Sequence, residues 1–181
     1  MKRRNNVVFL AESAVIAALY AVLTYIAAMM NLAYGAVQFR FSEALTVLPL
    51  FTPAAIPGLT VGCFISNLGS ALGIVDWIFG TIATFLGAVL TRMLREIKIG
   101  NIPLLAVLMP VFSNTFIIGF EISCLSEGGT FSLFNFTWPA FIGAAVSVGI
   151  GELAVCFLLG IPLILYLNKS KLFERIGKSN I

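Results

Sequence analysis

Histidine is absent from this 181-residue chain, and charged residues make up only 10% of it. Without histidine the chain cannot build a Ser-His-Asp triad or a histidine metal site. It also lacks the Walker A motif, so it cannot hydrolyse ATP by the P-loop route. Its three cysteines, Cys63, Cys124 and Cys156, do not have the spacing of metal ligands. These absences predict a protein that is not an enzyme and holds neither a metal nor another cofactor.

Hydrophobic residues make up 60% of the chain and charged residues 10%. A soluble domain carries roughly 25% charged residues and a smaller share of apolar ones. A globular protein with this composition would expose large apolar patches to water, so lipid is the natural solvent for its surface. A chain of 181 residues has room for about six helices of ~20 residues and little else. The composition therefore predicts an all-α integral membrane bundle that forms a single domain.

The basic residues are concentrated at three places along the chain. These are Lys2, Arg3 and Arg4 at the start, Arg92, Arg95 and Lys98 in the middle, and Lys169, Lys171, Arg175 and Lys178 at the end. Cytoplasmic loops of membrane proteins collect Lys and Arg, so all three clusters are expected on the cytoplasmic side. Arg40 is the exception and is expected on the opposite face.

Six membrane spans satisfy this distribution and place both termini in the cytoplasm. The predicted spans cover about 7–30, 43–55, 57–73, 76–94, 102–121 and 138–167. The second and third are short and are interrupted by Pro49, Pro53 and Pro57. Five or seven spans would divide the cations between the two sides.

Small residues form a stripe along the first predicted span. Ala14, Ala18 and Ala21, with Ala17 beside them, recur at steps of three and four residues. In lipid, such a stripe lets another helix approach closely. Two interpretations remain open, which are a docking face for a partner protein and a contact with another helix of the same chain.

Polar residues are expected to gather in the outer half of the bundle. Asp76 begins a polar, small-residue face on the fourth span, Asn114 and Glu121 share one side of the fifth, and Asn67 lies near the outer end of the third. Glu152 lies alone deep within the sixth span, where a charge costs several kcal/mol unless it is paired or hydrated. As a set these residues predict an outward-opening small-molecule pocket, although each Asn could instead bond only between helices.

The segment from Gln38 to Glu43 is the densest polar and aromatic patch outside the expected cytoplasmic side. Arg40 and Glu43 could pair at an exposed position, which contributes little to stability. The interpretation favoured here is that this loop covers the pocket and contacts the ligand. Trp77 could provide a stacking surface, or it could anchor the protein at the membrane interface, as is expected for Trp138.

Three stretches of the sequence resemble the queuosine-precursor transporter family. They are Gln38–Leu45 (QFRFSEAL), Asp76–Leu86 (DWIFGTIATFL) and Gly151–Leu163 (GELAVCFLLGIPL). The six-span scale, the alanine stripe and the basic clusters look like the substrate-binding S component of an energy-coupling factor (ECF) transporter. The resemblance extends over nearly the whole chain.

This resemblance implies a multi-pass subunit of the bacterial plasma membrane that captures a micronutrient outside. It implies as partners a transmembrane coupling protein, which Ala14, Ala18 and Ala21 would contact, and two cytosolic ATPases that supply the energy. The implied substrate is a 7-deazaguanine, whose adjacent N–H donors and aminomethyl cation suit carboxylates. The expected binding residues are Arg40, Glu43, Asn67, Asp76, Trp77, Asn114, Glu121 and Glu152.

Two alternatives remain at this point. The chain could be an S component for another flat, vitamin-like solute, or it could be a membrane scaffold whose polar faces only hold helices together. A scaffold gives no reason to keep four acids and an arginine in the outer half of the bundle.

Overall fold

A computed structural model describes residues 2–33, 39–99, 102–126 and 128–170, with only the backbone given for residues 2–5. These residues form a helical bundle without a β-sheet. Its elements are α1 (Lys2–Met29), η1 (Phe41–Leu50), α2 (Ala55–Asn67), α3 (Ile74–Met93), α4 (Leu104–Ser123), η2 (Leu133–Asn135), α5 (Trp138–Val155), η3 (Cys156–Gly160) and α6 (Ile161–Ser170). The prediction of an all-α protein is confirmed for this part of the chain.

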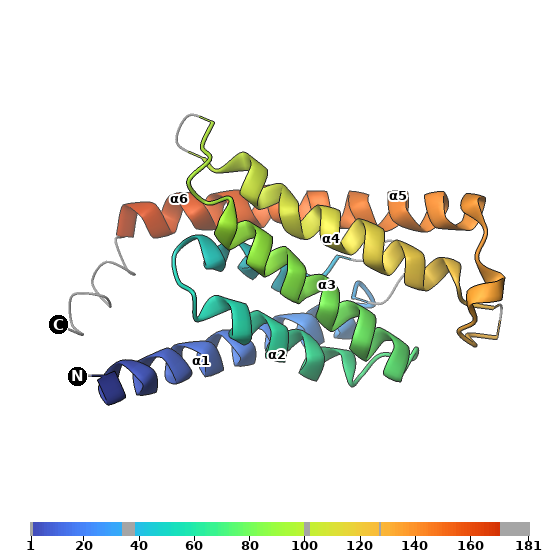
Figure 1. Cartoon of the computed structure of the whole chain (residues 1–181), viewed down its shortest axis with the longest axis horizontal. Coiled ribbons are helices and arrows are strands. Elements are labelled where there is room, and N and C mark those ends of the chain that lie inside the picture. Colours follow the sequence, from blue (N-terminus) through green and yellow to red (C-terminus); the bar gives the residue numbers. More distant parts are fainter. Residues whose placement is uncertain (1, 34–38, 100–101, 127, 171–181) are drawn as a thin grey trace.

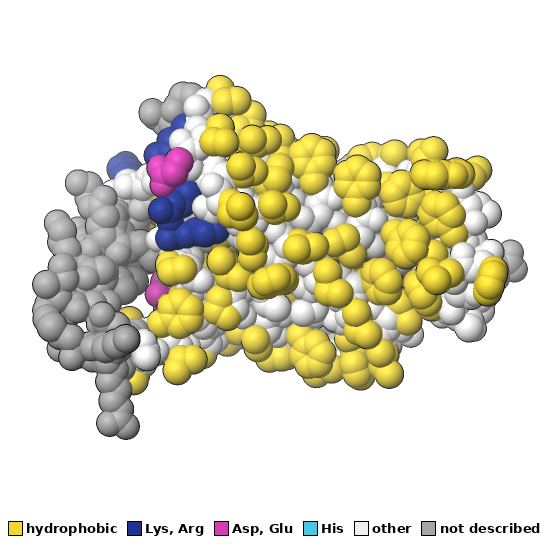
Figure 2. All heavy atoms as spheres, in the orientation of Figure 1, with side chains coloured by type: hydrophobic (Ala, Val, Ile, Leu, Met, Phe, Trp, Pro, Cys, Tyr) yellow, Lys and Arg dark blue, Asp and Glu magenta, His cyan; other side chains and the backbone are white. Residues whose placement is uncertain are grey.

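Four helical segments are long and apolar enough to cross a membrane. They are Asn6–Met29, Ile74–Met93, Leu104–Ser123 and the continuous Trp138–Ser170, which comprises α5, η3 and α6. Hydrophobic side chains cover most of the face in Figure 2, and the charged side chains visible there gather at one end. Such an apolar surface is stable in lipid rather than in water, so the protein is a multi-pass membrane protein.

The two short predicted spans differ most from the structure. The first becomes η1, a 3₁₀ helix of 10 residues that contains Pro49, and the second becomes α2, an α-helix of 13 residues. Both are shorter than the roughly 20 residues that a lone spanning helix requires. α2 ends at Asn67 instead of continuing to residue 73, because a turn follows in which Gly73 takes a φ of +61°. The described residues thus contain four membrane-length helices and two shorter apolar ones, and the predicted count of six spans stays a prediction.

The long helices pack in chain order around η1. α1 contacts α2, α2 contacts α3, α3 contacts α4, and α4 contacts α5, whereas η1 contacts α1 through α6 and also η3. η1 begins near the end of α1, where the Phe39 N–H donates to the Leu32 carbonyl at 2.9 Å, and ends near Arg92. A short helix with buried Ser42, Glu43 and Thr46 therefore forms the centre of the bundle.

The basic clusters lie at one end of the molecule. Figure 1 shows the start of α1, the end of α3 and the end of α6 at the same end of the bundle. Arg40 lies toward the other end, since its Nε donates to the Ala33 carbonyl beyond α1. The basic residues from Lys171 to Lys178 and the side chains of residues 2–4 lie outside the described part of the chain.

Glycines of α2 allow α1 to approach closely. A Cβ added to Gly62 would lie 2.8 Å from the Tyr20 Cβ and 2.9 Å from the Ala17 carbonyl oxygen, both on α1. By contrast, a Cβ on Gly143 of α5 would meet no atom within 4 Å. Close approach of small residues is how helices associate when lipid removes the hydrophobic drive between them.

We expect Gly62→Ala to destabilise the protein by about 1–3 kcal/mol, because α1 and α2 must separate to admit the methyl group. Thermal unfolding in detergent measures this change. Gly143→Ala is the matched control, and it should leave stability within about 1 kcal/mol of the parent or raise it, since alanine has the higher helix propensity. Equal effects of the two substitutions would contradict the packing argument.

Candidate functional site

Arg40 joins three elements within the protein interior. Its side chain is 7% exposed. Nε donates to the Ala33 carbonyl at 3.1 Å, Nη1 donates to Asn67 Oδ1 at 3.2 Å, and Nη2 lies 3.9 Å from Asp76 Oδ2. Asn67 Nδ2 in turn donates to the Asp76 backbone carbonyl at 3.0 Å. The arginine is therefore buried and paired with Asp76, not placed on the surface with Glu43.

Gly80 leaves room for this arrangement on α3. A Cβ at position 80 would collide with Asn67 Nδ2 and would approach Asp76 Oδ1 to 3.4 Å. Because Gly80 lies one helical turn after Asp76, both face α2. The first part of the polar, small-residue face predicted for this helix therefore meets Asn67.

Glu43 occupies the centre of the bundle and is 2% exposed. The Tyr20 hydroxyl of α1 donates a hydrogen bond to Glu43 Oε1. The second oxygen, Oε2, is buried without a hydrogen-bond partner among the described residues. Glu43 is thereby fixed by one oxygen and can accept a hydrogen bond with the other.

Glu152 is held in the same way by α4. Asn114 Nδ2 donates to Glu152 Oε1 at 2.7 Å, and Glu152 Oε2 is buried without a partner in the described chain. The carboxylate lies just before η3, a π-helical segment that separates α5 from α6. Single π-turns of this kind are frequent at functional sites.

Glu121, at the end of α4, is the least satisfied acid of the bundle. It is 0% exposed, and neither Oε1 nor Oε2 has a hydrogen-bond partner within the described ranges. The Glu121 carboxylate is repelled by Asp76 and attracted by Arg40. The Glu152 carboxylate is likewise repelled by Glu43 and attracted by Arg40. Four buried acids thus share the field of one buried arginine.

The chemical character of this cluster is that of an acceptor-rich site. Buried polar atoms nearly always have a partner, so each unpaired one requires an explanation. Four such carboxylate oxygens occur here, one each on Glu43 and Glu152 and two on Glu121. No group of three or more His, Cys, Asp or Glu side chains in the described residues could hold a metal ion. The cluster is suited to a ligand that donates several hydrogen bonds or carries a positive charge.

Seven of the eight residues expected to bind a ligand are buried in this region; Trp77 is half-buried. The Trp77 ring packs edge-on against Phe64 of α2, with centroids 6.3 Å apart, while its indole Nε1 is buried without a partner among the described residues. Trp138 is 68% exposed, as befits an interfacial anchor. Gln38 lies outside the described residues.

Sequence reasoning missed Tyr20, which is fully buried and bonded to Glu43. A signal was present, since Ser13, Tyr20 and Thr24 follow helical spacing and share one face of α1. That face meets the polar side of η1, where Thr24 Oγ1 donates to Ser42 Oγ at 2.7 Å.

Two alanines of the stripe face outward and two are buried in the bundle. Ala14 and Ala18 are exposed, whereas Ala21 is only 7% exposed. Ala17 is also buried, because Gly62 of α2 packs against it. Of the two interpretations left open, internal packing describes Ala17 and Ala21, and an outward-facing surface remains for Ala14 and Ala18.

Comparison with known proteins gives the family. The profile of the family described as QueT transporter matches residues 10–169. The protein named "Queuosine precursor transporter QueT" from Lactococcus lactis subsp. cremoris (strain MG1363) is 32% identical over 155 residues, which cover 77% of this chain and 89% of that protein. No solved structure matches the chain.

The match spans every described helix from within α1 to near the end of α6. It therefore includes the buried acids, Arg40 and the alanine stripe, and it concerns a family of transporters rather than enzymes. The resemblance to queuosine-precursor transporters is confirmed, and the chain belongs to the QueT transporter family.

Proposed function

We propose that this protein is the substrate-binding S component of an ECF transporter and that it captures a queuosine precursor of the 7-deazaguanine type. Family membership and the name of the Lactococcus relative support the substrate. The unpaired carboxylate oxygens of Glu43, Glu121 and Glu152 carry the proposal. A scaffold gains nothing from acids that are buried and left unsatisfied, because each one destabilises the fold.

The ligand's chemistry matches these acceptors. The guanine edge presents two adjacent N–H donors, and an aminomethyl substituent adds a cation. Glu121 has both oxygens unpaired in the described chain and so suits two parallel donors. Glu43 and Glu152 each retain one acceptor oxygen, which suits the cation.

The remaining residues complete the proposed set. Arg40, Asn67 and Asp76 fix the cluster's outer part through their mutual bonds. Asn114 orients Glu152, and the Trp77 indole N–H is a further donor. In this proposal the segment around Arg40 closes over the bound ligand.

Energy would come from partner proteins, since the chain has no Walker A motif. We place a transmembrane coupling protein against exposed Ala14 and Ala18, with two cytosolic ATPases attached to it. An apolar groove of about 510 Å³ runs between α1 and α6, where Val15 and Leu19, the residues that follow these alanines in the chain, line it together with Leu45 and Leu48 of η1. Its shape supports the approach of a partner helix.

The topology belongs to the same proposal. We place six passes through the bacterial plasma membrane, with η1 and α2 as short passes and both termini in the cytoplasm. The gathering of described cations at one end of the bundle supports this orientation.

A ligand panel tests the substrate. Calorimetric titration of the purified protein with 7-aminomethyl-7-deazaguanine, riboflavin and thiamin should give submicromolar binding of the first compound only. Riboflavin or thiamin binding would instead identify an S component for another solute. Binding of none of the three would contradict the proposed substrate and would favour the scaffold.

Glu121→Gln should weaken binding of the deazaguanine by roughly 1–3 kcal/mol, because one acceptor of a buried ligand donor is lost. The unfolding temperature should not fall, since the substitution removes an unpaired buried acid. Glu12→Gln is the matched control, because Glu12 also has a buried unpaired oxygen but lies in the α1–α6 groove, away from the cluster. Unchanged affinity in Glu121→Gln would remove this acid from the site.

Ala18→Trp should abolish assembly with the coupling protein while leaving ligand affinity unchanged, because a bulky side chain blocks close helix contact. Co-purification with the coupling protein and ligand titration measure the two properties separately. Ala140→Trp, at another exposed alanine on α5, should assemble normally. Loss of both properties in Ala18→Trp would contradict the separation of the partner surface from the binding site.

A further inference from the structure

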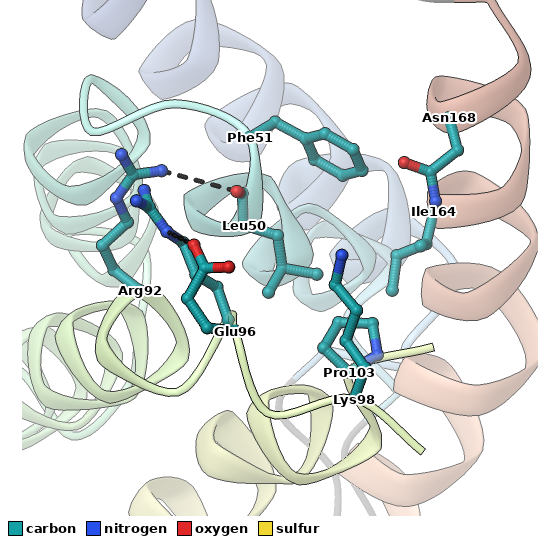
Figure 3. A pocket seen from close by; sticks show the side chains of 9 residues that line it. Leu50, Phe51, Arg92, Glu96, Lys98, Pro103, Ile164 and Asn168 are labelled. Carbon is teal, nitrogen blue, oxygen red and sulfur yellow. Dashed lines mark hydrogen bonds and ion pairs between the residues drawn. The ribbon is translucent and has the colours of Figure 1, made fainter. Parts of the chain in front are cut away.

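A second cavity lies at the basic end of the bundle, far from the buried acids. It has a volume of about 250 Å³ and forms where the ends of η1, α3 and α6 meet the start of α4. Its lining includes Arg92, Arg95 and Lys98, and Glu96 is the one acid among the described residues that line it. Figure 3 shows Arg92 and Glu96 on one side, Asn168 on the other, and Leu50 and Phe51 between them.

Arg92 is fixed in the wall of this cavity. Its Nη1 donates to the Pro49 carbonyl at 3.0 Å and lies 3.4 Å from the Leu50 carbonyl, at the end of η1. A guanidinium carries five N–H donors, so these two bonds from one nitrogen leave donors on Nε and Nη2. The cation is thus held in place before any ligand arrives.

The other cations are only partly neutralised. Arg95 Nε donates to Glu96 Oε1 at 2.8 Å, and this pair is open to solvent, with Glu96 77% exposed. Lys98 is exposed and makes no ion pair among the described residues. One acid therefore faces three cations, and the cavity keeps a net positive charge that favours an anion.

The lining is also amphipathic. Leu50, Phe51, Pro103 and Ile164 make up its apolar part. Outside it, the large side chains of Met93, Ile97 and Ile99 are 70%, 51% and 68% exposed on the same stretch that carries the cations. Apolar residues this exposed mark the edge of the lipid-facing surface. A small hydrated anion would use only the polar half of such a cavity.

We propose that this cavity binds the phosphodiester headgroup of an anionic phospholipid. Arg92, Arg95 and Lys98 would contact the phosphate, and the apolar lining would contact the adjoining glycerol and upper acyl chains. Basic pockets between helices at a membrane surface are suited to such headgroups. Basic residues that serve only to orient a protein in the membrane need no more than a position near the surface. Here they line a cavity, and hydrogen bonds hold one of them, Arg92, in place.

Native mass spectrometry of the detergent-purified protein tests the proposal with dioleoyl phosphatidylglycerol and dioleoyl phosphatidylcholine as probes. Phosphatidylglycerol should bind more tightly than phosphatidylcholine. Lys98→Gln should weaken its binding about fivefold, the effect of one cation near an anionic headgroup. Lys98 is exposed and makes no bond within the described residues, so the substitution should not disturb the fold.

Lys169→Gln is the matched control, because Lys169 is equally exposed at the same end of the bundle but does not line the cavity. It should leave phosphatidylglycerol binding nearly unchanged. An equal loss in both variants would overturn the proposal in favour of diffuse surface charge, as would equal binding of the two lipids by the parent. Displacement of phosphatidylglycerol by inorganic phosphate at equal concentration would show a free-anion site and would overturn the lipid assignment. These outcomes are independent of deazaguanine binding.

Discussion

The cost of exposing an ionisable side chain to hydrocarbon is the constraint on which this structure depends. Such exposure costs several kcal/mol, so the charged groups occupy two regions, the interior around η1 and the basic end of the bundle. Four membrane-length helices provide the apolar exterior between these regions. The interior position of η1 follows, because its Ser42, Glu43 and Thr46 would be unsatisfied in lipid.

Within the interior, Arg40 offsets part of the cost of burying acids. Its guanidinium bonds the segment after α1 to Asn67 of α2 and pairs with Asp76 of α3. One cation cannot compensate four acids, and unpaired oxygens remain on Glu43, Glu121 and Glu152 within the described chain. A stable protein tolerates such groups where a ligand completes their bonding. The same imbalance lowers the stability of the fold, and the proposed ligand would offset it.

The interior around η1 and the basic end of the bundle are suited to different chemistry. The interior site presents acceptors and attracts donors and cations, whereas the cavity at the end of α3 presents donors and attracts anions. η1 links the two regions, since Glu43 lies in its first turn and the carbonyls of Pro49 and Leu50 hold Arg92.

Sequence reasoning predicted the long helices well because their signal is local. Apolar runs of about 20 residues between basic clusters and glycine-containing turns define α1, α3, α4 and the α5–α6 segment within a few residues. It also singled out ionisable residues that the fold buries, because charges are rare and conspicuous in an apolar chain; their role in binding stays a prediction. Membership of the QueT family was predicted from three short stretches and is confirmed over residues 10–169.

Other features were decided only by the tertiary structure. Apolarity alone could not show that the run after residue 40 folds as a short 3₁₀ helix at the centre of the bundle, since long and short apolar helices both exclude water. Nor could spacing show that Ala21 packs inward while Ala18 faces outward, because the position of α2 decides this. The pairing of Arg40 with Asp76 instead of Glu43, and the bond from Tyr20 to Glu43, join residues distant in sequence. The sequence by itself determined which residues must avoid lipid, and only the folded arrangement determined which partners they find there.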